Sequence, residues 1–483
     1  MILSSILSGL KNYTVIGNVD INITNLSHSS KDVKKDGLFF CVAGTKTNGT
    51  LYVDEAVQNG ATAIVTENAC LTNITQIIVE NARRAMAVMA AIFFDNPQNK
   101  LKIIGITGTN GKTSCSYIIA QLLSAFGKKV GVIGTNGIFI DDKKQNCQMT
   151  TPDSIELFSI FDEMVKNSVQ YCVMEVSAHA IFFDKIFGIN FAVKALTNVT
   201  FDHLDFFETI KKYEQTKEKF FETGNCFVLN NDDKIGKKLT KKHKKSLNFG
   251  KNNAILQYFD VQTSLSGTSF FAKYNNKICK VKSKLIGDFN VSNLCLSIGV
   301  LLFLGFDFER VVDKISAIKN LPGRFDLVDN NFDIPIIVDY AHTYESLHQF
   351  LSQVKKISSN KNIIVFGCPG ERDTTKRFSM GKLAGEFCDY IILTSDNPAS
   401  ENPKRIMFEM ECGVKQTNAK CCCIENRNVA IKKAISMAKR KNGFNVLIVG
   451  KGIETYQIVG GKNIPYSDYD AIGLALNKLA NRV

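Results

Sequence analysis

The chain of 483 residues carries a formal net charge of +13 and 14 cysteines, and 45% of it is hydrophobic. Its length suits about three globular domains, and its composition excludes a disordered or collagen-like protein. No long apolar run and no positively charged leader is present, so we expect a cytoplasmic protein without membrane insertion.

The positive charge comes chiefly from lysine, much of it in runs such as KKLTKKHKKS at 237–246. No aromatic residues are interleaved with these lysines, so we interpret the runs as a solvated face and expect no nucleic-acid partner. The cysteines form no CxxC pair and have no histidines at metal-ligand spacing. We therefore expect reduced, structural thiols.

The first part of the chain, up to about residue 98, mixes short strands and helices. Strands are predicted at 37–44, 61–67 and 76–80, and helices at 52–60 and 82–94. The last helix runs into Asn96 and Pro97, and a proline after a helix is a natural stop. We place a domain boundary there.

From Leu101 onward, apolar strands alternate with helical stretches. The predicted strands are LKIIGIT at 101–107, KKVGVIGT at 128–135, VQYCVMEVS at 169–177, AVKALTNV at 192–199 and CFVLN at 226–230. This alternation predicts a mainly parallel, doubly wound sheet.

The first of these strands leads into a glycine-rich turn, GTNGKTS at 108–114, which opens a helix. Such a turn cradles phosphate: its N–H groups face the oxygens, Lys112 adds a positive charge, and the Thr113 hydroxyl is placed to bind Mg²⁺. An ordinary glycine turn is the alternative. The turn is shorter than the general nucleotide-binding loop. It still predicts an ATP-binding enzyme, but it does not by itself identify the class of enzyme.

Polar residues follow the next strands at their carboxyl ends, where ligands of parallel sheets bind. They are Glu175, Ser177, Asn198, Asp202, His203 and Asp205. Each alone has an ordinary explanation as a helix cap, a surface acid or a core histidine. Together, downstream of the phosphate loop, they indicate magnesium ligands.

The remaining chain changes pattern twice. Short alternating runs between about 251 and 286 predict a small antiparallel annex, and a helix follows at 290–305. A second series of buried strands then starts near Leu321 and leads into loops that contain Arg324, Asp339, His342, Glu371, Arg372, Lys376 and Arg377. Guanidinium groups bind phosphates and carboxylates, and an Asp at a strand end can hold a ribose.

These motifs together resemble the Mur ligases, most of all those that complete the UDP-N-acetylmuramoyl (UDP-MurNAc) tripeptide of peptidoglycan. The similar segments span nearly the whole chain: GTNGKTS, TTPDS at 150–154, EVSAHA at 175–180, TNVTFDHLD at 197–205, YEQTK at 213–217, GDFNVSN at 287–293, PGR at 322–324, DYAHT at 339–343, GERD at 370–373, SDNPA at 395–399 and GKGIETYQI at 450–458. The phosphate loop alone would also fit a folylpolyglutamate synthetase.

The resemblance implies an α/β protein of three domains. These are a small mixed α/β domain for the UDP-sugar at 1–98, a central doubly wound P-loop ATPase domain at 99–318, and a C-terminal Rossmann-like domain for the amino acid at 319–483. It also implies the chemistry, in which ATP phosphorylates the D-Glu side-chain carboxylate of UDP-MurNAc-L-Ala-D-Glu and a diamino acid attacks the acyl phosphate. We expect a monomer whose partners are these small molecules.

Residue roles also follow from the resemblance. The ATP site would comprise Gly108, Thr109, Asn110, Gly111, Lys112, Thr113 and Ser114, with Asn290, Arg324 and Asp339 for adenine, phosphate and ribose. Lys112, Glu175, His203 and Lys217 would be catalytic, and the Mg²⁺ ligands would be Thr113, Glu175, His203 and Lys217 as a carbamate. Carbamylation replaces a cation by a carboxylate that can hold a metal.

The resemblance further assigns two substrate sites. The UDP-MurNAc-dipeptide would contact Ser30, Thr45, Lys46, Thr47, Thr150, Thr151, Ser177 and Lys185. The amino acid would contact Arg377, Asp396, Asn397, Pro398, Ala399, Gly450 and Glu454.

Ala399 is the most informative departure from the family pattern. Enzymes of the family that select meso-diaminopimelate carry an arginine there, which binds the second carboxylate of that substrate. Without the arginine this carboxylate is poorly compensated. The sequence therefore favours L-lysine, with ornithine or diaminopimelate as alternatives. A more remote alternative is a basic nucleotide-binding protein.

Overall fold

The computed structural model describes residues 1–44, 47–141, 143–145, 147, 149–200 and 204–480. Two compact units divide the chain. The first comprises residues 1–258, 273–277 and 292–311, and the second comprises 259–272, 278–291 and 312–483. In the described residues, no helix combines the length and apolar character needed to cross a membrane.

The N-terminal part of the first unit is built on a five-stranded sheet of order β1-β5-β4-β3-β2, in which only β1 runs antiparallel to its neighbour. Its elements are α1 (Leu3–Ile6), β1 (Tyr13–Ile16), β2 (Asn25–Ser27), β3 (Gly37–Phe40), α2 (Val53–Gln58), β4 (Ala61–Thr66), β5 (Thr75–Val79) and α3 (Ala82–Phe93). Helices α1 and α3 pack on one face and α2 on the other, because alternate strand residues point to opposite faces.

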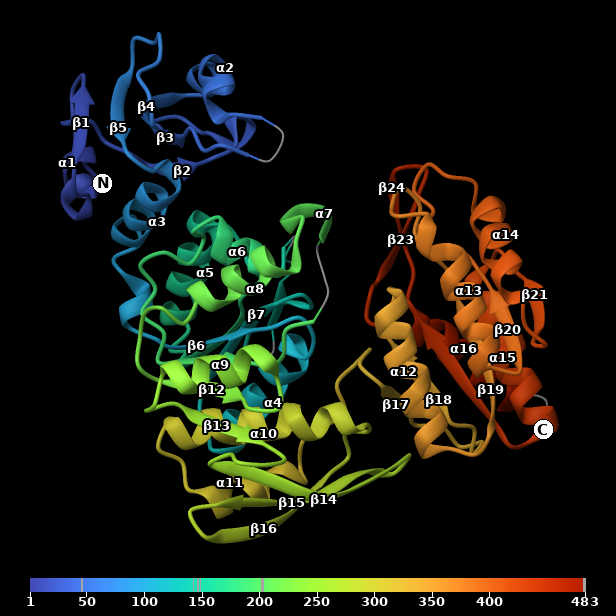
Figure 1. Ribbon diagram of the computed structural model, residues 1–483. Helices are drawn as coiled ribbons and strands as arrows, with labels where there is room; N and C mark the ends of the chain where they lie inside the picture. Colours follow the sequence, from blue (N-terminus) through green and yellow to red (C-terminus); the bar gives the residue numbers. More distant parts are fainter. Residues whose placement is uncertain (45–46, 142, 146, 148, 201–203, 481–483) are drawn as a thin grey trace. The chain divides into compact units, whose positions relative to one another are not determined.

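The central sheet follows, with strand order β16-β15-β14-β13-β12-β11-β6-β10-β7-β8-β9 (Figure 1). Its strands are β6 (Lys102–Thr107), β7 (Val130–Gly134), β8 (Gly137–Ile140), β9 (Lys143–Gln145), β10 (Tyr171–Glu175), β11 (Val193–Leu196), β12 (Phe227–Asn230), β13 (Leu247–Gly250), β14 (Leu256–Ser264), β15 (Gly267–Tyr274) and β16 (Lys277–Ser283). The predicted annex is therefore continuous with this sheet, through the parallel pairing of β13 and β14.

Helices connect these strands: α4 (Lys112–Ala125), α5 (Ser154–Lys166), α6 (Ala178–Phe182), α7 (Leu204–Phe207), α8 (Ile210–Lys219), α9 (Lys234–Lys242), α10 (Asp288–Phe303) and α11 (Phe308–Ile315). Strand β6 pairs in parallel with β10 on one side and β11 on the other. The chain order therefore reverses at β6, and ligands of doubly wound sheets bind beyond the carboxyl ends of strands at such a point.

The second unit contains a six-stranded sheet of order β17-β18-β22-β19-β20-β21, with β17 antiparallel to β18 and the remaining pairs parallel. Its strands are β17 (Asp326–Val328), β18 (Ile336–Asp339), β19 (Lys361–Phe366), β20 (Tyr390–Leu393), β21 (Lys420–Cys423) and β22 (Phe444–Val449), and a hairpin of β23 (Tyr456–Val459) and β24 (Lys462–Pro465) follows.

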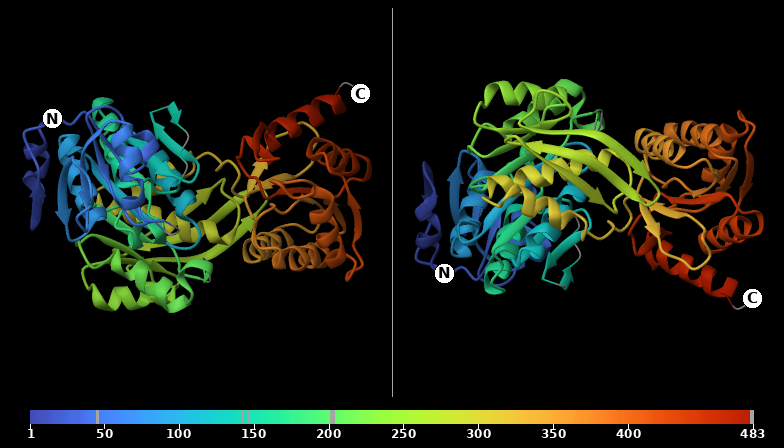
Figure 2. Two further views of the ribbon diagram at one scale, coloured as in Figure 1. Left: turned by 90° about the horizontal axis from the view of Figure 1, so that it is seen from above. Right: turned by 90° about the horizontal axis from the view of Figure 1, so that it is seen from below.

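The helices of this unit are α12 (Tyr344–Ile357), α13 (Thr375–Phe387), α14 (Pro403–Val414), α15 (Arg427–Lys441) and α16 (Asp468–Ala480). Residues from α12, α13 and α14 pack on one face of the sheet, and residues from α15 and α16 pack on the other. Figure 2 shows α16, in dark red, on the opposite side of the sheet from α12, in golden orange. This two-sided packing confirms a Rossmann-like arrangement.

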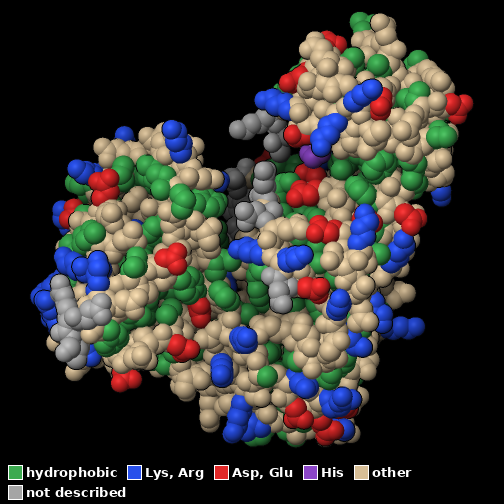
Figure 3. All heavy atoms as spheres, turned by 180° about the vertical axis from the view of Figure 1, so that it is seen from behind, with side chains coloured by type: hydrophobic (Ala, Val, Ile, Leu, Met, Phe, Trp, Pro, Cys, Tyr) green, Lys and Arg blue, Asp and Glu red, His purple; other side chains and the backbone are tan. Residues whose placement is uncertain are grey.

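The three large sheets, with helices packed on them, confirm the predicted α/β class, while the domain boundaries at 98 and 318 stay predictions. All 14 cysteines are free in the structure. The sequence did not predict β1, β2, β8, β9, β13, β17, the hairpin of β23 and β24, or β21 with its three consecutive cysteines. On the face shown in Figure 3, lysine and arginine side chains are dispersed among acidic ones.

Candidate functional site

The phosphate loop joins β6 to α4 and depends on two glycines. Gly108 and Gly111 have φ angles of 147° and 85°, which residues with a side chain rarely adopt. A Cβ atom on Gly108 would lie 1.9 Å from Thr197 Oγ1, and one on Gly111 would lie 2.6 Å from Asn293 Oδ1. The loop is therefore specific for glycine at both positions, as a phosphate cradle requires.

Two lysines converge on this loop. Lys112 Nζ donates to the carbonyl oxygens of Gly108 (2.9 Å) and Thr109 (2.8 Å), and Lys217 Nζ donates to the same Gly108 oxygen at 2.9 Å. Lys217 is only 1% exposed, and its ammonium lies 4.7 Å from the centre of the Tyr213 ring. Two lysine side chains thus reach the loop where an anionic phosphate would bind.

Glu175, at the end of β10, faces the first turn of α4. Its carboxylate is 1% exposed and accepts hydrogen bonds from Thr113 Oγ1 (3.0 Å) and the Thr135 N–H (2.9 Å). Carboxylate and hydroxyl oxygens are hard donors that Mg²⁺ prefers, so this pair fits the ion.

The structure does not assemble the full predicted metal set. His203 and Asp202 lie outside the described residues, as do Thr45 and Lys46 of the predicted sugar site. Among the described residues, no group of three or more His, Cys, Asp or Glu side chains is arranged to hold a metal. The magnesium site stays a prediction that rests on Thr113 and Glu175.

The other loop residues hold the cradle together. Thr109 Oγ1 lies 3.1 Å from the Tyr213 hydroxyl, and the Asn110 N–H donates to Asn198 Oδ1 at 3.0 Å. Ser114 is buried in the first turn of α4. Asn198, at the end of β11, thus fixes the loop from the neighbouring strand.

The TTPDS segment lies against the end of β10. Thr151 Oγ1 donates to the Glu175 carbonyl oxygen (2.9 Å) and to Ser177 Oγ (3.3 Å), and Thr150 Oγ1 lies 3.1 Å from Thr135 Oγ1. Ser177 also caps α6 by accepting from the Ala180 N–H. Three of the predicted sugar-peptide contacts are therefore close to the phosphate loop.

A charged cluster lies beside this segment. Lys185 is buried with its Nζ 3.2 Å from Asp153 Oδ1, and Arg83 and His28 place nitrogens 4.0 Å and 3.9 Å from the same carboxylate. Arg83 also donates to the Ala43 carbonyl oxygen at 2.6 Å, next to the predicted uridine loop. The sequence analysis missed Arg83, since its position in a helix gave no signal.

Ser30 and Thr47, the other described residues of the predicted sugar site, make contacts of their own. The Ser30 hydroxyl is buried and donates to Glu55 Oε2 at 2.6 Å. Thr47 is exposed, and its carbonyl oxygen accepts from the Gly44 N–H. Within the described residues, neither side chain forms a hydrogen bond or ion pair with Lys185 or Ser177.

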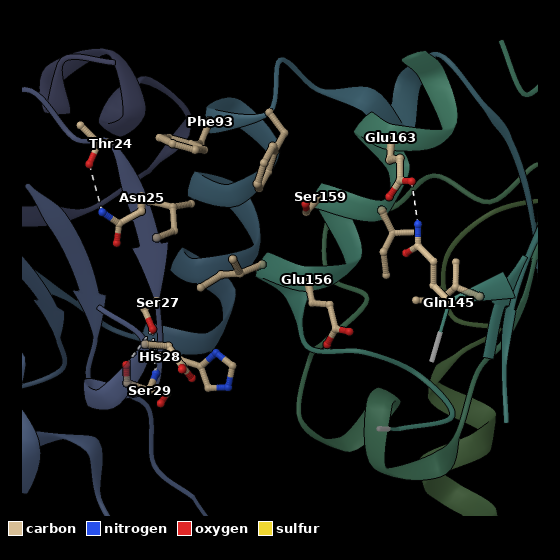
Figure 4. A pocket seen from close by; sticks show the side chains of 16 residues that line it. Thr24, Asn25, Ser27, His28, Ser29, Phe93, Gln145, Glu156, Ser159 and Glu163 are labelled. Carbon is tan, nitrogen blue, oxygen red and sulfur yellow. Dashed lines mark hydrogen bonds between the residues drawn. The ribbon is translucent and has the colours of Figure 1, made fainter. Parts of the chain in front are cut away.

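A pocket of about 580 Å³ lies next to His28. Figure 4 shows Thr24 to Ser29 on one side of it and Glu156, Ser159 and Glu163 of α5 on the other. Its lining includes acidic side chains and, among the described residues, no lysine or arginine. These carboxylates would repel a diphosphate. The cluster of Lys185 and Arg83 beside the TTPDS segment suits a diphosphate better.

In the second unit, Asp339 ends β18 and holds the PGR loop. Its carboxylate accepts from the Phe325 N–H (2.7 Å) and the Ala341 N–H (2.8 Å), and burial raises its pKa. The Arg324 guanidinium lies 4.9 Å from the centre of the Tyr340 ring. Asn290, also in this unit, is buried and donates to the Ile286 carbonyl oxygen.

Loops that follow β20 and β22, the strands on either side of β19, meet around a buried lysine. Lys451 is 0% exposed, and its Nζ lies 2.7 Å from Glu454 Oε2, 3.0 Å from Asn397 Oδ1 and 3.9 Å from Asp396 Oδ1. Burial raises the pKa of Asp396, and the positive charge of Lys451 partly offsets this rise. Gly450 is fitted to this cluster, because a Cβ there would lie 2.7 Å from Asp396 Oδ2. The sequence analysis had not singled out Lys451.

Arg377 interacts with other acidic residues than those around Lys451. It is 1% exposed and forms ion pairs with Glu401 (3.0 Å) and Glu409 (2.8 Å). Arg372, on the preceding loop, is exposed and has no ion pair within the described residues. Ala399 is half-buried, with a φ of 53°, and its N–H donates to the Ile458 carbonyl oxygen. Pro398 next to it is buried.

Family profiles match three consecutive segments of the chain. They are described as Mur ligase family, catalytic domain (22–100), Mur ligase middle domain (106–301) and Mur ligase, glutamate ligase domain (323–452).

A curated relative is the UDP-N-acetylmuramoyl-L-alanyl-D-glutamate–2,6-diaminopimelate ligase 1 of Clostridium acetobutylicum. It is 38% identical over 485 residues, which cover 99% of this chain and 100% of that protein. Seven further curated relatives, 35% to 38% identical, are also named as 2,6-diaminopimelate ligases.

Two solved structures are similar along the chain. One is a UDP-N-acetylmuramoyl-L-alanyl-D-glutamate–2,6-diaminopimelate ligase with a TM-score of 0.69 and 28% identity, covering 95% of both chains. The other is the MurF ligase of Thermotoga maritima in complex with ADP, with a TM-score of 0.62 and 19% identity, covering 95% of this chain and 98% of that one. At that identity the second likeness concerns the fold alone.

Proposed function

The chain belongs to the Mur ligase family and is an ATP-dependent ligase that forms an amide bond; from this premise we propose that it joins a diamino acid to UDP-MurNAc-L-Ala-D-Glu. The bond would form at the D-Glu side-chain carboxylate, in peptidoglycan synthesis. The phosphate loop is the observation that supports the proposal. Lys112 and Lys217 both donate hydrogen bonds to the Gly108 carbonyl oxygen, and the Thr113 hydroxyl donates one to Glu175.

The loop suits transfer of a phosphoryl group to a carboxylate. Lys112 would leave the Gly108 and Thr109 carbonyls and neutralise the γ-phosphate as a carboxylate oxygen attacks its phosphorus, with ADP as the leaving group. The amine of the diamino acid then attacks the acyl carbon, and phosphate departs while the amine loses a proton. A bound Mg²⁺, held by Thr113 and Glu175, would neutralise phosphate charge.

Lys217 is proposed to act as a carbamate. Its Nζ is buried beside Gly108, at the point where phosphate would arrive. Addition of CO₂ to the neutral amine gives a carboxylate with two hard oxygen donors, which could hold a second metal ion against the acyl phosphate. His203 is proposed to join this set.

The two ends of the substrates would meet different loops. Thr150, Thr151, Ser177 and Lys185 would contact the muramoyl dipeptide, and Ser30 with Thr45 to Thr47 the uridine. Asn290, Arg324 and Asp339 of the second unit would hold adenine, phosphate and ribose. The ranges 1–98, 99–318 and 319–483 are proposed as the three domains.

The amino-acid site is proposed around Lys451, with Asp396, Asn397, Gly450 and Glu454 as its wall and Pro398 and Ala399 at its edge. Glu454 can accept from an ammonium group of the substrate. Because Arg377 is already paired with two glutamates, we reassign the substrate carboxylate to the exposed Arg372.

For the third amino acid, the names of eight relatives favour 2,6-diaminopimelate. L-lysine is the second candidate, and one observation favours it: Ala399 cannot bind a second carboxylate. Ornithine is chemically close to lysine. Cytoplasmic location, a monomeric state and the lack of a nucleic-acid partner stay predictions.

A phosphate-release assay tests the proposal. We expect release to require ATP, UDP-MurNAc-L-Ala-D-Glu and one diamino acid together, and a panel of diaminopimelate, lysine and ornithine identifies the third substrate. Absence of turnover with every member of the panel would contradict the proposal. Activity on folate and glutamate instead would identify a folylpolyglutamate synthetase, and nucleic-acid binding that survives moderate salt without ligation would favour a nucleic-acid role.

A further inference from the structure

Lys194 is a buried lysine in the middle of the central sheet. It lies on β11, directly opposite Gly105 of β6 in the strand register, and is 5% exposed. A buried ammonium group is unfavourable unless hydrogen-bond acceptors compensate it. The surroundings of its Nζ atom therefore indicate what the residue does.

The compensating groups come from the end of α8. Lys194 Nζ donates to the carbonyl oxygens of Phe220 (2.7 Å) and Thr223 (2.7 Å) and to Thr223 Oγ1 (2.9 Å). Three acceptors match the three N–H groups of an ammonium. Within the described residues no carboxylate lies at ion-pair distance from Lys194. The contacts are thus made to backbone and hydroxyl oxygens at a helix terminus, where carbonyls lack helical partners.

The same residues connect α8 to the phosphate-loop strand. The ammonium lies 4.8 Å from the centre of the Phe220 ring and 5.5 Å from that of Phe191. Both rings pack directly on Gly105, where a Cβ would lie 2.6 to 2.7 Å from them. β6 continues from Gly105 into the phosphate loop. Lys194 therefore links this strand to the C-terminal end of α8.

The last turn of α8 carries Lys217, whose Nζ is 2.9 Å from the Gly108 carbonyl oxygen. We propose that Lys194 is a positioning residue, which fixes the last turn of α8 and thereby holds Lys217 at the phosphate loop. This inference rests on the proposed function, because it requires that Lys217 acts in ligation. Burial lowers the pKa of Lys194 to about 8, in keeping with an environment kept apart from water.

Lys194→Met removes the three donors and keeps the length of the apolar chain. Lys219→Met is the matched control. Lys219 lies on the last turn of α8, as Lys217 does, but its side chain is exposed. Thr223→Ala is a milder variant that removes one acceptor. Amide hydrogen exchange of the segment 210–223 is measured in the full-length protein, and ligation is measured with the diamino acid that supports turnover.

We expect Lys194→Met to speed exchange in this segment at least about tenfold, Thr223→Ala to do so less, and Lys219→Met to leave it unchanged. kcat should fall at least about tenfold in Lys194→Met while the KM for ATP changes little, since misplacing a catalytic group affects the chemical step. Unchanged exchange in 210–223, or a kcat equal to that of Lys219→Met, overturns the inference. A loss spread over the whole chain, with kcat and KM both altered, assigns Lys194 a general stabilising role instead and also overturns it.

These outcomes are separable from a failure of the proposed function. Should the wild-type protein turn over no diamino acid, the proposed function fails on that result. The exchange measurement would still show whether Lys194 holds α8, and the claim about Lys217 in ligation would fall with the function.

Discussion

Gly108→Ala tests the phosphate loop most sharply, because two separate features of the structure oppose it. The φ angle of 147° disfavours any residue with a Cβ, by about 1–2 kcal/mol. The new Cβ would also lie 1.9 Å from Thr197 Oγ1, so Thr197 would have to give up its 2.6 Å hydrogen bond to the Asn110 carbonyl oxygen, worth about 1 kcal/mol.

Together these terms disfavour the nucleotide-binding conformation of the loop by about 2–3 kcal/mol. A site that forms only at this cost binds its ligand roughly 30- to 150-fold more weakly. We expect this loss in the dissociation constant for ATP, measured by titration calorimetry or by displacement of a fluorescent nucleotide, and a parallel loss of ligation.

Gly127→Ala is the matched control. Gly127 follows the other end of α4 with a φ of 72°, and a Cβ there would meet no atom within 4 Å. It should lower stability by about 1 kcal/mol and leave ATP affinity unchanged. Thr197→Ala in the Gly108→Ala background should regain part of the affinity, since the contact with the Asn198 carbonyl oxygen at 2.9 Å remains. Wild-type affinity in Gly108→Ala would refute the reasoning.

Three further predictions concern Lys217, Ala399 and Lys451. Lys217→Ala should abolish ligation and regain part of it with added formate or acetate, which can replace the carbamate; phosphate release checks this, and a variant as active as wild type would show that Lys217 is not needed. Ala399→Arg should raise kcat/KM for diaminopimelate relative to lysine, and an unchanged ratio would remove the argument for lysine. Lys451→Met should destabilise the second unit by about 3 kcal/mol, because Asp396 loses its buried cation. Thermal unfolding measures this loss, Asp396→Asn in the same background should restore part of it, and an unaltered transition would show that Asp396 does not depend on Lys451.

Much of the fold could be predicted because its signals are local. Each core strand is a short apolar run, and β6, β10 and β11 lie where these runs predicted. The phosphate loop was recognisable from its glycines, whose positions the φ angles explain. Lys217 was singled out only by its register after Tyr213, and the structure brings both to the loop.

The rest depends on contacts between distant segments. The sequence analysis treated Arg377 as available to substrate, but Glu401 and Glu409, far along the chain, pair with it. Lys451 lies within a glycine-rich loop, where a lysine is usually solvated, and only the fold surrounds it with acids. Lys194 is one lysine in an apolar strand, and its acceptors lie at the end of a helix that follows later in the chain.

We propose that this chain transfers phosphate to a carboxylate before it forms the amide. The most direct test uses UDP-MurNAc-L-Ala-D-Glu with ¹⁸O in the D-Glu side-chain carboxylate, together with ATP and the accepted diamino acid, followed by mass spectrometry of the released phosphate. Because one carboxylate oxygen bridges to phosphorus and leaves with it, we predict one ¹⁸O atom in each phosphate. Unlabelled phosphate, or ¹⁸O in AMP, would contradict the account.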